Sequence, residues 1–247
     1  GSIGYKVTKL AIELGKKIAS VSAMNGRSDA AYHEIGLRTG GLGISMVGFE
    51  PGMSSFFAGR GYYHLDKCEE MYLYVGGGLP VKPRPPFNYF TTWSLYDNIN
   101  QFNQPATVVR GGEAKRIPAL SEVMPFEIED YKDLQCFTSD GLGGLFRCFK
   151  DVPEMAAYTV RWPGVADQMR FLNDLDLFDE EERKLGKVNQ VPRDILMDIF
   201  SKKYERLPGE ADMSILRIVT KGLKGNDRIT YTFEIAQREI PETGYTS

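Results

Sequence analysis

The chain has 247 residues, 42% of them hydrophobic and 26% charged, and its formal net charge is −3. Such a chain is long enough to bury a sizeable core, but it offers no basic field for nucleic acid and no apolar run long enough to span a membrane. Three cysteines without Cys-x-x-Cys spacing indicate reduced thiols and a cytoplasmic location, and two histidines give little basis for a metal site. We therefore expect no nucleic acid, no membrane and no metal among its partners.

The first part of the chain alternates between helical and strand-like patterns. Residues 5–17 carry an apolar stripe at helical spacing, and residues 28–41 begin with a capping serine and end on glycines. Each of these predicted helices precedes a short apolar run, at residues 18–22 and 42–49, that indicates a buried strand. The order helix, strand, helix, strand predicts a parallel βα piece.

The pattern changes near residues 48–52, and a second set of elements follows. We predict helices over residues 51–65, 95–102, 164–178 and 192–204, strands over 68–75, 87–94 and 156–162, a strand, turn and short helix over 133–149, and hairpins over 106–120 and 213–240. These elements predict a chain that combines helices and strands (α/β), with an α+β second part in which helices flank a mixed or antiparallel sheet.

A run of glycines stands at the end of the strand predicted over residues 68–75. Gly76, Gly77 and Gly78 precede a stiff, basic, proline-rich loop, and the strand predicted over residues 87–94 comes after it. A strand end without side chains allows close approach of a ligand or of another stretch of backbone. The same residues would also suit an ordinary bulge or turn, so both interpretations stay open.

Five segments in order along the chain carry a family resemblance. They read "MVGFEPGMSSFFA", "VGGGLPVKPRPPFNYFTTWS", "FTSDGLGGLF", "TVRWPGVADQMRFLNDLDLFD" and "YTFEIAQREIPETGYTS". Together they resemble the saccharopine dehydrogenase-like family, and within it most closely the archaeal-type lysine 6-dehydrogenases. The resemblance implies an amino-terminal Rossmann domain that binds NAD or NADP, and a second domain that holds a small amino-acid substrate such as lysine or saccharopine and forms a homodimer.

The resemblance also implies how this chain divides. Residues 1–48 would be the carboxyl-terminal remnant of the Rossmann domain, and residues 49–247 the substrate-binding and oligomerisation domain. Because the chain has no Gly-x-Gly-x-x-Gly turn after a first strand, tight dinucleotide binding is not expected. We therefore expect a fragment, inactive by itself, of an NAD(P)-dependent oxidoreductase that acts on CH–NH groups. The alternatives are a stand-alone dimerisation or small-ligand-binding module without redox activity, and a reductive coupling enzyme like carboxynorspermidine synthase.

The resemblance assigns a catalytic role to Glu50, which stands where the family has an Asp before Pro-Gly. There it would anchor the substrate amine beside the nicotinamide, with possible acid–base duty; the alternative is a carboxylate that favours a helix start. Ser22 and Glu50 are the expected cofactor contacts. Saccharopine-forming relatives have Cys at the position of Gly76, so the absence of this cysteine favours the lysine-dehydrogenase branch.

The resemblance implies that the remaining expected site residues line the substrate pocket. Tyr89 and Trp93 would share one face of the strand predicted over residues 87–94, although aromatic residues there are also typical of a core. Asp140 follows a strand at the pocket edge, where an Asx-turn or helix cap is the other interpretation.

Thr159 and Arg161 are expected on one strand face, with Arg161 as the carboxylate-binding residue because a guanidinium fork holds both oxygens. A structural ion pair is the alternative for Arg161. Saccharopine-specific relatives carry another Arg near the position of Ser139, and its absence indicates that a second substrate carboxylate has no partner here.

Overall fold

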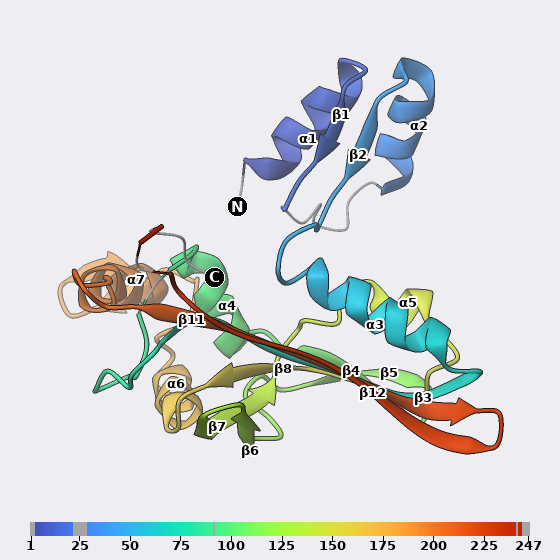
Figure 1. Ribbon diagram of the computed structural model, residues 1–247. Coiled ribbons are helices and arrows are strands. Elements are labelled where there is room, and N and C mark those ends of the chain that lie inside the picture. The colour runs from blue at the N-terminus through green and yellow to red at the C-terminus, as the bar shows by residue number, and fades with distance from the viewer. Residues whose placement is uncertain (1–2, 22–28, 91, 241, 244–247) are drawn as a thin grey trace. The chain divides into compact units, whose positions relative to one another are not determined.

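The computed structural model of the chain describes residues 3–21, 29–90, 92–240 and 242–243. The chain divides into two compact units, Gly1–Arg60 and Gly61–Ser247 (Figure 1). The boundary predicted from the sequence, between residues 48 and 49, concerns function rather than compactness, and it stays a prediction. Among the described residues, no helix has the length and apolar character that a membrane crossing requires.

The first unit is a small parallel βα piece. Its elements are α1 (Gly4–Glu13), β1 (Lys17–Ala19), α2 (Asp29–Thr39), β2 (Leu42–Ile44) and the start of α3 (Met53–His64). The strands β1 and β2 pair in parallel, with Ile18 opposite Gly43. The buried Ile12 of α1 packs on this pair, and the Thr39 hydroxyl donates a hydrogen bond of 2.6 Å to the Ile12 carbonyl. The predicted order of helices and strands, and their parallel pairing, are confirmed.

The second unit is a mixed sheet with helices against one of its faces. Its sheet strands are β3 (Lys67–Pro80), β4 (Ala106–Arg110), β5 (Glu113–Ile117), β6 (Met124–Ile128), β7 (Tyr131–Thr138), β8 (Glu154–Arg161), β11 (Asp212–Lys224) and β12 (Asp227–Arg238). Its further helices are α4 (Leu95–Asn103), α5 (Leu145–Cys148), α6 (Val165–Asp174) and α7 (Pro192–Lys203). A separate two-stranded hairpin consists of β9 (Arg183–Leu185) and β10 (Val188–Gln190).

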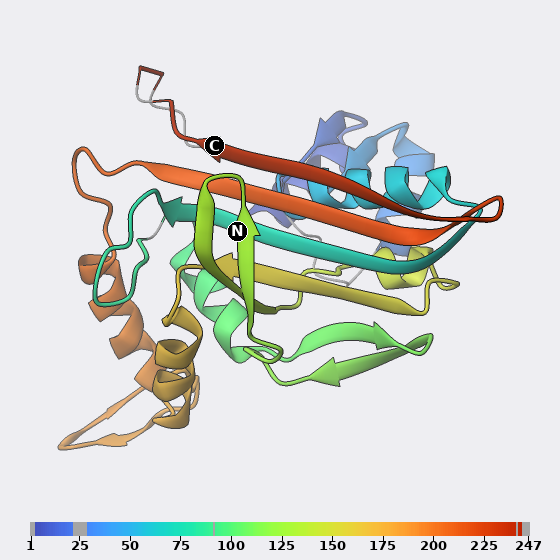
Figure 2. The same ribbon diagram turned by 60° about the horizontal axis from the view of Figure 1, so that its bottom comes forward.

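The sheet of this unit has eight strands, in the order β12, β11, β3, β8, β4 and β5. The hairpin of β6 and β7 joins it through β7, which pairs with the second half of β8, and this hairpin crosses the front of the sheet in Figure 2. The pairing of β3 with β8 is parallel, with Val75 opposite Thr159, whereas the other pairs are antiparallel. The predicted mixed α/β sheet flanked by helices is therefore confirmed.

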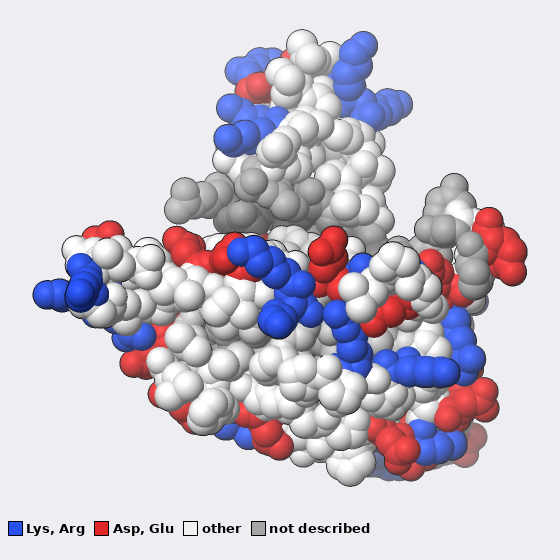
Figure 3. Space-filling view, turned by 90° about the vertical axis from the view of Figure 1, so that its left-hand side faces the viewer, with Lys and Arg blue, Asp and Glu red and all other residues white. Residues whose placement is uncertain are grey.

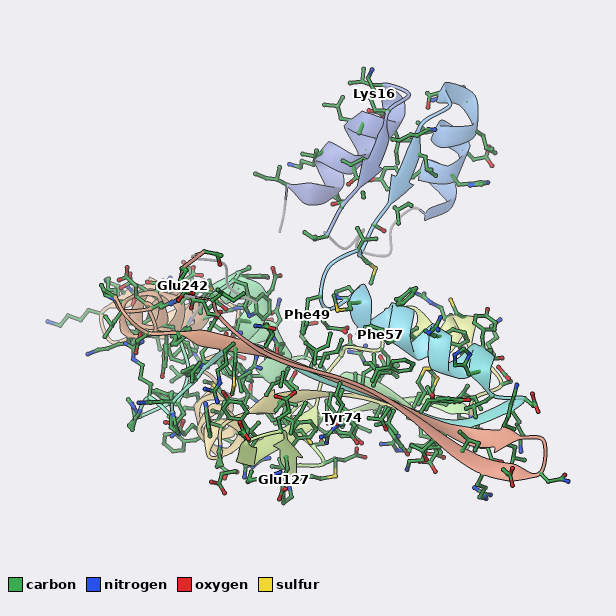
Figure 4. The ribbon with its side chains drawn as sticks, in the orientation of Figure 1. Lys16, Phe49, Phe57, Tyr74, Glu127 and Glu242 are labelled. Carbon is green, nitrogen blue, oxygen red and sulfur yellow. The ribbon has the colours of Figure 1, made fainter. Side chains whose placement is uncertain are left out.

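Apolar clusters of described residues lie on opposite faces of this sheet. The first lies beneath the hairpin of β6 and β7, where Tyr74 stacks on Tyr158 with ring centroids 5.0 Å apart and contacts Phe126 of β6 at 5.2 Å. Figure 4 shows Tyr74 on the sheet and Glu127 on β6 below it. The second core joins α4, α6 and α7 to the opposite face through side chains such as Phe137.

Local signals explain where the helices of this unit begin. The Ser94 side chain accepts a hydrogen bond of 3.3 Å from the Asp97 amide at the start of α4, and Pro192 occupies the first turn of α7. On α6, the apolar stripe predicted from the sequence buries Val165 and Met169 in the second core. On the face of this unit that Figure 3 shows, acidic and basic side chains are interspersed.

Two predictions about strands are corrected in detail, and the structure contains strands that were not predicted. The strand predicted over residues 87–94 is an irregular loop wherever the structure describes it. The strand predicted over residues 68–75 continues through the three glycines to Pro80 as β3. The strand β6 and the small hairpin of β9 and β10 were not predicted.

Candidate functional site

The parallel pairing of β3 with β8 runs up to Val75 and Thr159, two residues before Gly77 and Arg161. A Cβ atom added to Gly76 would lie 3.2 Å from the Val160 side chain, so these two residues are also neighbours. Because side chains alternate along strands, Thr159 and Arg161 share the face opposite to that of Val160. A Cβ atom added to Gly77 would meet no described atom within 4 Å, which leaves open space over its backbone.

Arg161 is buried without a carboxylate partner among the described residues. Its side chain is only 2% exposed; Nη1 donates to the Val160 carbonyl at 2.8 Å and Nη2 to the Gln101 Oε1 atom at 3.3 Å. The Nε atom has no hydrogen-bond partner in the described ranges of the chain, and the guanidinium lies 5.2 Å from the centre of the Tyr89 ring. Burial lowers the pKa of Arg161, and Tyr89 partly offsets this.

Hydrogen bonds connect the side chains next to this guanidinium with further polar residues. The Thr159 hydroxyl lies within hydrogen-bonding distance of Ser139 Oγ, at 2.9 Å, and of Gln101 Oε1, at 3.3 Å. The buried Tyr89 hydroxyl accepts a hydrogen bond from the Asn98 amide. Burial raises the pKa of Tyr89, while the charge of Arg161 acts in the opposite direction. We call Gln101, Ser139, Thr159 and Arg161, with Tyr89, the Arg161 cluster.

Two members of this cluster were not predicted as site residues. Gln101 comes from α4, as does Asn98, and Ser139 follows β7. The spacing of Asn98 and Gln101, three residues apart, places both on one side of a helix whose Ile99 and Phe102 are buried. Polar residues on the core-facing side of a short helix were the sequence feature from which Gln101 could have been predicted as a site residue.

Gly76 and Gly78 allow close packing of neighbouring side chains and leave no open space for a ligand. A Cβ atom at Gly76 would lie 2.7 Å from the Leu79 side chain, and one at Gly78 would overlap the Thr92 side chain. Gly78 also has a φ of +64°, a conformation that side chains disfavour. Of the three predicted glycines, Gly77 alone therefore has free space where a side chain would stand.

Other predicted residues have structural partners. Asp140 accepts a hydrogen bond of 3.1 Å from the Thr107 amide and lies 4.0 Å from an Arg116 nitrogen, so it fixes the hairpin of β4 and β5. Trp93 is 40% exposed and contributes to the surroundings of Tyr89. Because residues 87–94 form no strand, Tyr89 and Trp93 do not share a strand face, and that prediction is corrected.

Glu50 belongs to the first unit, and its pKa departs from the ordinary value of a glutamate. Burial raises its pKa to about 7, and the nearby Ser54 hydroxyl lowers it by a smaller amount. Its Oε2 atom is buried without a hydrogen-bond partner in the described part of the chain. Ser22, the other expected cofactor contact, lies outside the described residues.

The pKa of Glu50 predicts a measurable pH dependence of stability. Because the folded state holds this proton up to about pH 7, and the ordinary value is 4.5, the free energy of unfolding should fall as pH rises between these values. In Glu50→Gln this loss is absent. Urea unfolding at pH 5 and pH 8 should therefore show the wild type losing about 1–3 kcal/mol more than the variant across this range. Parallel pH profiles of the two proteins would contradict the assignment.

Comparisons with known proteins agree with this fold. The structure of saccharopine dehydrogenase (L-Glu forming) from Saccharomyces cerevisiae is similar, with a TM-score of 0.76 and 15% sequence identity, over 100% of this chain and 70% of that chain. The protein yvaA from Bacillus subtilis matches with a TM-score of 0.29 and 14% identity, over 95% of this chain and 63% of that chain, a score too low to indicate a shared fold. Residues 48–247 match the saccharopine dehydrogenase C-terminal domain. The chain therefore belongs to the saccharopine dehydrogenase C-terminal domain family.

Proposed function

We propose that the second unit holds the carboxylate of an amino-acid substrate for an NAD(P)-dependent oxidoreductase that acts on CH–NH groups. The resemblance of the sequence favours lysine 6-dehydrogenase, with a saccharopine dehydrogenase as the related choice. The observation that supports this proposal is the buried guanidinium of Arg161, which has an unpartnered Nε atom and no carboxylate partner among the described residues.

A buried positive charge without a counterion is costly to the folded protein. Transfer of an isolated charge out of water is strongly unfavourable, and proteins normally pair such groups. A substrate carboxylate would supply the missing counterion and two acceptor oxygens for the planar fork. The open space over Gly77 allows such a ligand to lie against the backbone of β3.

Two further residues have proposed roles. Thr159, which shares the strand face of Arg161, would orient the ligand carboxylate through its hydroxyl. Glu50, in the first unit, keeps its expected acid–base role as a separate proposal, since a carboxyl group whose pKa is about 7 can take up or release a proton near neutral pH.

The cofactor of such an enzyme is NAD or NADP, which accepts or donates the hydride. The residues of this chain do not fit its pyrophosphate, because the sequence carries no Gly-x-Gly-x-x-Gly turn that leads from a strand into a helix. We therefore assign substrate binding, and no redox step, to the described residues. A homodimer and a cytoplasmic location stay predictions.

L-Lysine and L-lysinamide together test the proposed function. The two ligands share both amino groups, but lysinamide has a neutral amide in place of the carboxylate. Isothermal titration of the 247-residue chain should show lysine binding at least about tenfold tighter than lysinamide, because a charged hydrogen bond to Arg161 is lost with the amide. Equal affinities, or no binding of lysine, would overturn the proposal.

A carboxylate-binding module without redox activity is the second candidate, favoured by the missing glycine turn. It predicts the same preference for lysine over lysinamide. The candidates separate when the longest natural protein that contains this chain is mixed with lysine and NAD or NADP. A change in nicotinamide absorbance supports the enzyme, and an unchanged spectrum with retained lysine binding supports the module.

A further inference from the structure

The acceptor that faces Arg161 on the helical side is an amide rather than a carboxylate. Gln101 Oε1 lies 3.3 Å from Arg161 Nη2 and 3.3 Å from the Thr159 hydroxyl, so one neutral oxygen contacts both. The Thr159 hydroxyl in turn lies 2.9 Å from Ser139 Oγ. These contacts link α4, β8 and the residue after β7 through uncharged groups.

The neutrality of this set is unusual for the surroundings of a buried arginine. Buried guanidinium groups are ordinarily paired with Asp or Glu, and Arg193 in the same unit shows that arrangement through its ion pair with Glu180. Among the described residues, Gln101 from α4 and Tyr89 from the loop before it contact the guanidinium, and Thr159 on β8 and Ser139 after β7 connect to it through Gln101. Of these, Tyr89 is the titratable one.

We propose, resting on the proposed function, that Gln101 is a positioning and specificity-determining residue that orients Arg161 while leaving its charge available to an anionic ligand group. A glutamine holds the Nη2 atom through a hydrogen bond but contributes no counter-charge. A glutamate of the same size at this position would form an internal ion pair and occupy the guanidinium. Residue 101 therefore decides whether the site accepts a carboxylate or is already neutralised.

The variants Gln101→Glu and Gln101→Met separate these effects. In Gln101→Glu we expect lysine binding to weaken by about 30-fold or more, because the ligand must displace an internal carboxylate. Lysinamide binding should change little, so the preference for lysine disappears. In Gln101→Met the charge of Arg161 stays free, and we expect weaker lysine binding with the preference for lysine over lysinamide retained.

Gln104→Glu is the matched control, since Gln104 is exposed at the end of the same helix and the substitution adds the same charge. It should leave both affinities unchanged. Far-ultraviolet circular dichroism and melting curves of all variants check folding. A Gln101→Glu protein that is folded and still prefers lysine, or equal effects of Glu and Met at position 101, would overturn the inference. Wild-type protein that fails to prefer lysine would overturn the proposed function instead.

Discussion

Replacement of Arg161 by Met is expected to stabilise the fold and to remove ligand binding at the same time. Arg161 is 2% exposed and has no carboxylate partner in the described part of the chain. A methionine of similar length removes the buried charge and keeps most of the packing. We expect the free energy of unfolding to rise by about 1–3 kcal/mol and lysine affinity to fall about 100-fold or more. Urea unfolding and isothermal titration of the same preparations measure both effects.

Arg193→Met is the matched control for this prediction. Arg193 is 3% exposed, but it pairs with Glu180, donates to the Tyr96 carbonyl at 3.2 Å and stacks over the Tyr96 ring at 4.2 Å. Loss of these partners should lower the free energy of unfolding by about 1–3 kcal/mol. Opposite signs for the two arginines would support a binding role for Arg161. Destabilisation by both substitutions, to a similar degree, would show that Arg161 is a structural residue.

Substitutions at Gly77 and Gly78 are expected to have opposite consequences although the residues are neighbours. Alanine at Gly78 must adopt a φ of +64° and displace the Thr92 side chain, so we expect a loss of about 2–4 kcal/mol in the free energy of unfolding. Alanine at Gly77 enters open space and should change the free energy of unfolding by less than about 1 kcal/mol. Chemical denaturation of both single variants gives the comparison.

Valine at Gly77 extends this test from stability to binding. Its side chain would fill the open space that we assign to the ligand, so the protein should stay folded while lysine affinity falls at least about tenfold. Unchanged affinity in Gly77→Val would place the ligand elsewhere. A strong loss of stability in Gly77→Ala would show that the space is needed for packing.

Much of the fold follows from short-range signals in the sequence. The hairpin of β4 and β5 turns at Gly111 and Gly112, both at positive φ, as the glycine pair predicts. The helix α4 was also predicted, and in the structure Ser94 caps it. The parallel βα piece of the first unit was also predictable, because its short apolar runs alternate with helical stripes. These features depend on residues a few positions apart, which is why one sequence is enough to predict them.

The errors arise where distant residues decide the local conformation. Residues 87–94 have strand-like composition, yet Tyr89 and Phe90 are buried as parts of a loop, through contacts that include the Arg161 and Arg206 guanidinium groups. The strand β6 contains Pro125, a residue that ordinarily argues against a strand. The continuation of β3 through its glycines depends on close contact with Val160 and Thr92 from elsewhere in the chain.

The candidate site was predictable only in part for the same reason. The period of a strand places Thr159 and Arg161 on one face of β8, as the structure shows them. Nothing in the local pattern indicates that Gln101 and Ser139 meet them, since these residues reach Thr159 through tertiary packing of α4 and the end of β7. The assignment of Asp140 to the pocket came from the resemblance, whereas its contacts are with Thr107 and Arg116.

The central position of β3 has a consequence for biosynthesis. This strand hydrogen-bonds to β8 on one side and β11 on the other, and residues 81–153 must be made before the first of these partners begins to emerge from the ribosome. Parallel and long-range pairings of this kind close slowly because loop entropy must be overcome before any contact forms. The nascent apolar strand therefore stays unpaired until translation has passed β8, when Val75 can pair with Thr159.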